Sequence, residues 1–223
     1  MWSQLGQVVA EFFPLAVGVA LSPLPLIAAV IISLGSGGGG RAVALVAGRF
    51  LGVVVVVGVF AALSELFADA GGSAIVLSAL NVLLGLAMMV FGVLTWARRP
   101  RGDEADSPPK WMASLTGVSG PSAFGLGFTL SAANVKELAF GAGAGILIGG
   151  TLTEAPPTIA AVAIFAAIGT VTAAAPVLAV LIGGERIRPA LDRLHAALIR
   201  SSRTITAVVL VLFGAVLLSS SFG

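Results

Sequence analysis

The chain has 223 residues, of which 58% are hydrophobic and only 10% charged, and its mean hydropathy is +1.09. A soluble domain carries about 25% charged residues, so this chain has too few charges for an aqueous surface, and its solvent is expected to be lipid. The net charge of +2 argues against a nucleic-acid-binding face. Cysteine is absent and His195 is the sole histidine, which excludes disulfides and a multi-histidine metal site.

We predict an all-α membrane protein with six transmembrane helices, because a span needs about 20 mostly apolar residues. Such stretches lie at residues 12–34, 43–65, 73–96, 122–149, 157–183 and 204–221. The first lacks the basic segment of a cleaved signal peptide, so we expect it to be retained. Before the sixth, Glu185–Arg203 has leucines at helical spacing opposite a basic face, which predicts a cytoplasmic amphipathic helix on the membrane surface.

Basic residues are confined to alternate loops, which predicts the orientation of the protein. They follow the first, third and fifth spans: Arg41; Arg98, Arg99, Arg101 and Lys110; Arg186, Arg188, Arg193, Arg200 and Arg203. The other loops and both termini hold none and carry Glu11, Glu65, Asp69 and Glu154 instead. We therefore expect a multi-pass protein of the plasma (inner) membrane with both termini outside the cytoplasm.

The charged, proline-bearing stretch 98–120 is the one long linker, and it divides the chain into three spans plus three. We expect residues 1–97 to form a first three-helix repeat, 98–120 a cytoplasmic linker and 121–223 a second repeat. Because three is odd, the second repeat would enter the membrane in the opposite direction, which is the topology of an inverted repeat in secondary transporters. The segments Gly18–Leu26 and Gly127–Lys136 share a glycine and a Leu-Ser pair at the same spacing.

The first span contains Ser22, Pro23 and Pro25 in sequence. Proline has no amide hydrogen and disturbs the helix one turn back, so we expect a hinge here that turns Ser22–Pro25 toward the bundle interior. A plain proline kink that only shapes packing is the alternative. Elsewhere, Gly48-x-x-x-Gly52 and Gly141-x-x-x-Gly145 predict close helix packing.

Lys136 lies near the middle of the fourth span, where an ammonium group costs about 2.5–3.5 kcal/mol. Glu137 is its neighbour, but adjacent helical residues do not face each other, so a cross-helix partner or a bound anion is expected. The functional interpretation is a wet site for an anionic substrate, which in a locally unwound helix includes Asn134. The structural alternative is an internal salt bridge, or hydrogen bonds to carbonyls that the prolines leave free.

Arg49 lies about two turns inside the second span. It either snorkels to the headgroups or turns inward as a cationic entry to the Lys136 site, since its planar fork suits phosphate, sulfate or carboxylate. The candidate substrate-binding residues are Lys136, Asn134, Arg49, Ser22, Glu137 and Ser131. We expect no catalytic residues, no metal site and no cofactor, because no nucleophile–base set is visible.

The motifs "LSPLPLIAAVIISL" at Leu21–Leu34 and "NVKELAF" at Asn134–Phe140 resemble the LysE superfamily of small exporters, and within it the GAP family of glycolipid- or sulfolipid-addressing proteins. The family motif is commonly Asn-Pro-Lys, and Val135 here stands in place of the proline. The resemblance implies transport of polar lipids in an actinobacterial cell envelope, or assistance to a larger lipid exporter. It points to Ser22, Pro23, Pro25, Asn134 and Lys136.

The leading hypothesis is a transporter or flippase that moves an anionic polar lipid, phosphorylated, sulfated or glycosylated, across the plasma membrane. One alternative is an exporter of an amino acid or other small carboxylate, which predicts a water-filled pocket closed to lipid. Another is a non-transporting adaptor of a larger lipid-export complex, which predicts no pocket at Lys136. Candidate partners are membrane lipids, the anionic substrate, a larger exporter and a second copy of the chain, but no nucleic acid.

Overall fold

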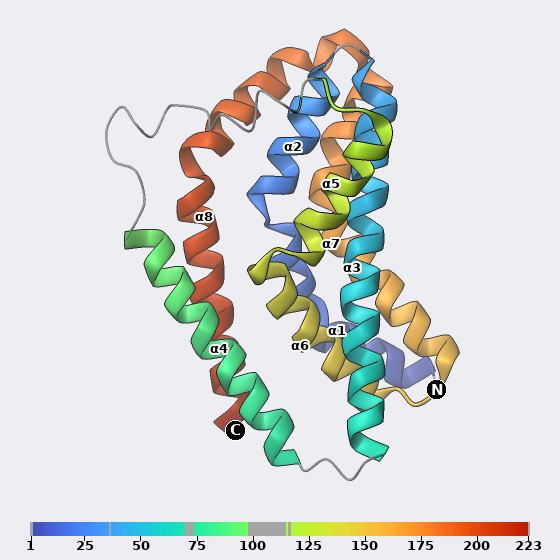
Figure 1. Cartoon of the computed structure of the whole chain (residues 1–223), viewed down its shortest axis with the longest axis vertical. Coiled ribbons are helices and arrows are strands. Elements are labelled where there is room, and N and C mark those ends of the chain that lie inside the picture. The colour runs from blue at the N-terminus through green and yellow to red at the C-terminus, as the bar shows by residue number, and fades with distance from the viewer. Residues whose placement is uncertain (1, 36, 70–73, 98–114, 116, 223) are drawn as a thin grey trace.

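The structure is a computed structural model that describes residues 2–35, 37–69, 74–97, 115 and 117–222. Within these ranges every regular element is a helix, which confirms the all-α class (Figure 1). In chain order the helices are α1 (Trp2–Ala20), α2 (Pro23–Leu34), α3 (Gly38–Asp69), α4 (Ala74–Ala97), α5 (Gly120–Ala132), α6 (Val135–Thr151), α7 (Ala155–Gly183), the short 3₁₀ helix η3 (Gly184–Ile187) and α8 (Arg188–Phe222). Most of the predicted linker, 98–114 and 116, lies outside the described residues.

Two helices of the described part, Gly38–Ser64 within α3 and Ala155–Gly183, are long and apolar enough to cross a membrane. The bent pair α1–α2 brings the number to three if it counts as one span. Large apolar side chains lie on the surface, among them Ile159 at 68% and Ile182 at 87% exposure, as lipid contact requires. These helices confirm a membrane protein, whereas the crossing of the membrane by α4, the α5–α6 pair and α8 stays a prediction.

Both predicted broken spans are interrupted in the structure. The first bends by 53° between α1 and α2, at Leu21 and Ser22, directly before Pro23, which confirms the expected break, whereas its role as a hinge stays a prediction. The fourth is interrupted at Ala133 and Asn134, between α5 and α6, although Val135 stands where the family has proline. Ser22 and Asn134 have nearly the same extended backbone, with φ/ψ of −88°/111° and −84°/113°.

Helix α3 packs closely against α5 and α6 through glycines. A Cβ atom on Gly48 would lie 2.0 Å from the Phe124 carbonyl oxygen of α5, and one on Gly149 would lie 2.2 Å from the Ala61 oxygen of α3. Gly52 faces α5, and Gly141 and Gly145 face α3, so both predicted small-residue motifs lie at helix contacts. The backbones therefore approach closely around the middle of α3.

The basic segment Glu185–Arg203 does not form a separate helix, which corrects that part of the prediction, whereas its place on the membrane surface stays a prediction. From Arg188 onward it is continuous with the last predicted span and forms α8. Pro189 lies in the first turn of this helix, where proline is tolerated, and no further proline or glycine occurs before Gly214. Figure 1 shows the first part of α8 running obliquely across one end of the molecule before it turns alongside α4. Glycines bring these two helices together, since a Cβ on Gly214 would lie 2.8 Å from the Gly85 oxygen.

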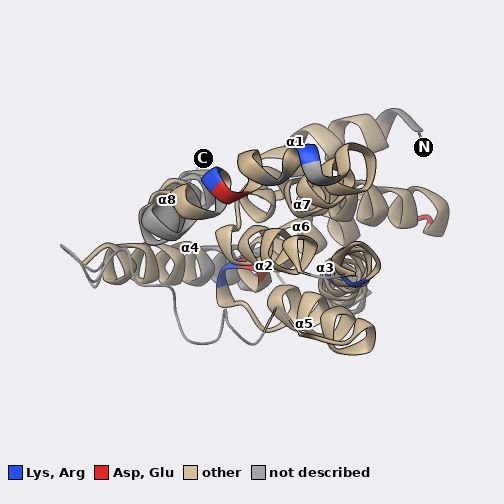
Figure 2. Cartoon of the chain, turned by 90° about the horizontal axis from the view of Figure 1, so that it is seen from above, with Lys and Arg blue, Asp and Glu red and all other residues tan. Residues whose placement is uncertain are grey.

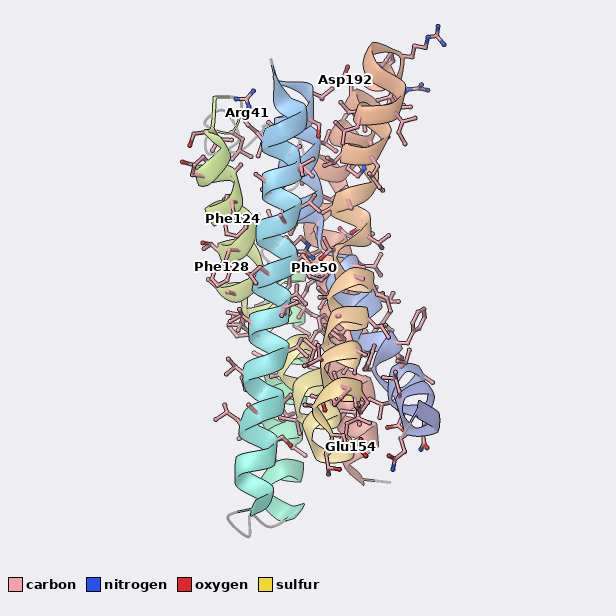
Figure 3. The ribbon with its side chains drawn as sticks, turned by 90° about the vertical axis from the view of Figure 1, so that its right-hand side faces the viewer. Arg41, Phe50, Phe124, Phe128, Glu154 and Asp192 are labelled. Atoms are coloured by element: carbon pink, nitrogen blue, oxygen red, sulfur yellow. The ribbon has the colours of Figure 1, made fainter. Side chains whose placement is uncertain are left out.

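The ends of the chain lie toward the same end of the molecule (Figure 1). Arg41 and Asp192 lie at the opposite end from Glu154 (Figure 3), as the alternation of basic and acidic loops predicts. Seen from above, most of the described ribbon is uncharged (Figure 2). The charges inside the bundle are therefore few, and they gather where the two broken helices are interrupted.

Candidate functional site

The interruption after α1 leaves backbone carbonyl groups without their usual helical partners. In a continuous helix the oxygens of Val19 and Leu21 would accept from residues 23 and 25, but these are prolines and have no amide hydrogen. The Ser22 amide donates to the Val19 oxygen at 3.2 Å and so does not reach the Gly18 oxygen. Buried carbonyls need donors, and here they must come from side chains.

Three helices supply these donors. The Lys136 ammonium donates to the Gly18 oxygen at 3.0 Å and, more weakly, to the Leu21 oxygen at 3.5 Å. Arg49 donates to the Val19 oxygen at 3.0 Å, and the Thr172 hydroxyl donates to the Ala20 oxygen. Two cations thus lie at the carboxyl end of α1, where the helix dipole favours positive charge.

Arg49 connects four segments of the bundle. Its side chain is fully buried, and its Nη1 donates to both carboxylate oxygens of Glu137 at 3.0 and 2.8 Å and to Ser131 Oγ at 3.2 Å. Its Nη2 donates to the oxygens of Val19 and Gly169, each at 3.0 Å. One side chain of α3 therefore holds the end of α1, the end of α5, the start of α6 and the middle of α7.

The three charges of this cluster do not cancel. Arg49 and Glu137 form a buried ion pair, whereas Lys136, which is 5% exposed, makes no salt bridge of its own within the described residues. Two of its three ammonium hydrogens are directed to neutral carbonyls, so the cluster keeps a net charge of +1. A buried uncompensated charge is costly, which makes this place attractive to an anion.

Asn134 ends the gap between α5 and α6 as the N-cap of α6, since its side-chain oxygen accepts from the Lys136 amide at 3.1 Å. We predict that Asn134→Ala destabilises the protein by about 1 kcal/mol, because the first turn of α6 loses its cap. Thermal unfolding in a neutral detergent measures this loss. Asn134→Ser keeps a capping oxygen without adding a charge and should stay within a few tenths of a kcal/mol of the wild-type stability; equal losses in both variants would show that the cap is not what matters.

A cavity of about 540 Å³ adjoins the cluster between α6 and the α4–α8 pair. Most of its walls are apolar, and Asn134, Lys136, Thr95 and Thr206 are the polar residues along them. Lys136 is the sole charged residue among those that line this cavity in the described part of the chain. The remaining lining residues are Phe60, Ala87, Met88, Phe91, Val135, Leu138, Ala139, Ala142 and Leu210.

The structure divides the predicted site residues into two groups. Lys136 and Asn134 line the cavity together, as expected for an interrupted helix. Arg49, Glu137 and Ser131 instead hold one another in the buried cluster, which corrects two expectations for Arg49. It neither snorkels nor offers a free cationic entry, because Glu137 and two carbonyls occupy its guanidinium.

Ser22 and both hinge prolines are buried at the first interruption, as predicted, but they are not among the residues that line the cavity. Sequence reasoning missed Thr172, which bonds the end of α1, and Thr95 and Thr206 of the cavity wall. The signal that could have indicated these threonines is the presence of a hydroxyl side chain within a long apolar span. It also missed that Arg49 and Glu137, two ionisable residues deep in predicted spans, are partners.

The resemblance to known proteins agrees with these motifs. A family model described as "Sap, sulfolipid-1-addressing protein" (SfLAP) matches residues 12–223. No curated protein and no solved structure matches the chain. The match covers both interrupted helices, the charged cluster and the cavity walls, and it confirms the expected kinship with the sulfolipid-addressing proteins. The chain belongs to the SfLAP family.

Proposed function

We propose that the protein is a transporter or flippase that moves a polar lipid with an anionic headgroup across the plasma membrane. The observation that carries this proposal is the apolar cavity beside Lys136, whose ammonium has no carboxylate partner in the described residues. The headgroup would supply the missing negative charge, and the tails would lie along the apolar walls. The family is named for a protein that addresses a sulfolipid, which is an anionic amphiphile of this kind.

The proposal includes six spans arranged as two inverted repeats of the LysE type, with both termini outside the cytoplasm. Each half begins with an interrupted helix, and Ser22 and Asn134 have nearly equal dihedral angles at the two interruptions. The ends of the chain lie toward the same end of the molecule, as an even number of spans requires (Figure 1). Interrupted helices that meet at the middle of a bundle form substrate sites in many secondary transporters. We propose transport with no enzymatic step and no cofactor.

A non-transporting adaptor of a larger lipid exporter is the second candidate. The observation that favours it is the anchoring of Lys136 to the oxygens of Gly18 and Leu21, which gives the ammonium a structural role. An adaptor does not need the cavity, however, whereas a lipid transporter does. The apolar walls likewise argue against a small carboxylate as cargo.

Lipid translocation in reconstituted vesicles tests the function. We expect the wild-type protein to move a fluorescent lipid with a sulfate or phosphate headgroup faster than a zwitterionic analogue. Lys136→Met removes the charge at nearly constant length and should slow the anionic lipid about tenfold or more, because a charge-assisted hydrogen bond contributes about 1.5–3 kcal/mol. Lys136→Arg keeps the charge and should retain most of the rate.

A second pair of variants tests the cavity itself. Ala87→Phe places a large side chain in the cavity from an exposed position of α4 and should block translocation. The matched control is Ala163→Phe at an exposed position of α7 that does not line the cavity. Equal rates in all variants, or no translocation by the wild-type protein alone, would favour the adaptor.

A further inference from the structure

We propose that Glu137 is a proton-binding site, and that proton uptake there is coupled to binding of the anionic headgroup. This inference rests on the proposed function, because it assumes that an anion binds beside Lys136. It adds the proton as a coupling ion to the proposed transport cycle, which follows neither from the family match nor from the cavity. The evidence is the distribution of charge around one buried carboxylate.

Glu137 is 3% exposed, and few charged groups surround it. Helix α6 packs against α1, α3, α4, α5 and α7. Helices α4, α5 and α7 contain no Asp, Glu, Lys, Arg or His, and the one such residue of α1 is Glu11, which is exposed and accepts a hydrogen bond from Gln7. Ser131 of α5 is the polar neighbour that shares Arg49 with the carboxylate.

Helix α3 supplies Arg49, and its other described charges are remote from it along the helix. Arg41 lies eight residues before Arg49, and Glu65 and Asp69 lie sixteen and twenty residues after it, or about 12, 24 and 30 Å along the helix at 1.5 Å per residue. The charges of α8 all lie between Arg188 and Arg203, before its apolar part. Within the described part of the chain, the charge state of the cluster thus depends on Arg49, Lys136 and Glu137.

Protonation of Glu137 changes the net charge of this cluster from +1 to +2. The added proton occupies a carboxylate oxygen, no other bond changes, and Arg49 loses its counter-ion while it stays fully buried. Two buried cations then lack an ionised carboxylate, and an anion in the cavity that Lys136 lines would compensate part of this charge. Anion binding and proton binding therefore favour each other, and linkage makes this effect reciprocal.

Reciprocal coupling gives transport a source of energy. An anion that binds with a proton carries less net charge through the cycle, and a proton gradient across the membrane then drives the lipid. The interrupted helices also gain a switch, because loss of the ion pair weakens the link between Arg49 of α3 and the start of α6. A headgroup in the cavity and an ionised Glu137 thus belong to different states of the cycle.

Binding of decyl sulfate to the protein in a neutral maltoside detergent tests this coupling. A sulfate ester stays ionised at ordinary pH, so any pH dependence belongs to the protein. We expect the affinity to rise about tenfold as the pH falls and Glu137 takes up its proton, since the interaction between two unit charges stays appreciable even at an effective dielectric constant of about 20. Proton uptake on binding, recorded with a pH indicator in weak buffer, should reach about half a proton per anion at its maximum, which is the value that linkage gives for a tenfold change in affinity.

Three variants separate Glu137 from other origins of a pH effect. Glu137→Gln imitates the protonated carboxyl, and its amide oxygen still accepts from Arg49, so we expect affinity near the low-pH wild-type value with no pH dependence or proton uptake. Lys136→Arg keeps a cation at every pH, so a dependence that survives there does not come from titration of Lys136. Glu137→Asp keeps a carboxyl group and should keep the coupling between proton and anion binding. If Glu137→Gln does not fold, Glu137→Asp and Lys136→Arg together still show whether the pH dependence comes from the carboxyl group.

The outcomes distinguish the two proposals. Binding of decyl sulfate that needs Lys136 but is independent of pH, with no proton taken up, overturns the proton site and leaves the proposed function intact. No binding of decyl sulfate by the wild-type protein, or equal binding by Lys136→Met, overturns both. Inorganic sulfate is the remaining arm: affinity equal to that of decyl sulfate would assign the site to a free anion and contradict a lipid headgroup.

Discussion

Replacing Arg49 by methionine is expected to destabilise the protein by about 3–5 kcal/mol, because it leaves Glu137 buried without a counter-ion. The oxygens of Val19 and Gly169 lose a donor in the same step. Thermal unfolding of the purified protein in neutral detergent, together with its recovery from the membrane, measures the effect. The control is Arg193→Met, because Arg193 is exposed and bonds only within its own helix, so its change should stay within about 0.5 kcal/mol.

The double variant Arg49→Met/Glu137→Gln shows how much of the loss comes from the stranded carboxylate. We expect it to be more stable than Arg49→Met alone, since the buried carboxylate is then absent, although the oxygens of Val19 and Gly169 still lack the bond from Arg49. Equal stabilities would assign the loss to the carbonyl bonds. A wild-type stability in Arg49→Met would show that the four segments do not depend on this side chain.

Gly127→Ala is expected to have an effect of similar size, from steric overlap. A Cβ atom there would lie 2.0 Å from the Leu45 carbonyl oxygen and 2.9 Å from the Arg49 backbone nitrogen. These backbone atoms cannot move aside without displacing α3. Overpacking costs about 1–3 kcal/mol or more, and we expect the upper end of that range. The measurement is again thermal unfolding, together with the fraction of protein recovered as a single species.

The matched control lies two residues away on the same helix. A Cβ on Gly125 meets nothing within 4 Å, so Gly125→Ala should be neutral or slightly stabilising, because alanine favours helix over glycine. Gly48→Ala should repeat the loss from the α3 side, since its Cβ would lie 2.0 Å from the Phe124 oxygen. Equal stabilities of the two α5 variants would contradict the close approach of α3 and α5.

The sequence predicts most reliably what covalent structure dictates. Pro23 lacks an amide hydrogen in any fold, so the interruption of the first span could be expected, as could the burial of Lys136 from its place in an apolar run. The pairing of Arg49 with Glu137 joins residues 88 positions apart, and no local pattern encodes such a contact. The continuity of α8 had a visible signal, because no helix breaker separates its basic segment from the start of the last span.

The interruption at Asn134 was harder to foresee, because no proline follows it. It depends on the N-cap of α6, on the ion pair of Glu137 and on contacts of both segments with α3, all of which are tertiary or short-range polar effects. Asn is a preferred N-cap, and Asn134 with Glu137 three residues later resembles a capping box. That pattern favours a helix start even inside an apolar stretch.

The two interruptions differ in whether the helical hydrogen-bond ladder can close across them. At Ser22 the following proline disfavours helical dihedrals, and no amide hydrogen exists to close the ladder, so this discontinuity is permanent. At Asn134 every residue has its amide hydrogen, and Ala133 already has nearly helical angles of −112° and 0°. A rotation of ψ at Asn134 from 113° toward about −42° would fuse α5 and α6 into one rod. The molecule thus has one bend at which the helical hydrogen-bond ladder cannot close and one at which a change of a single dihedral angle would close it.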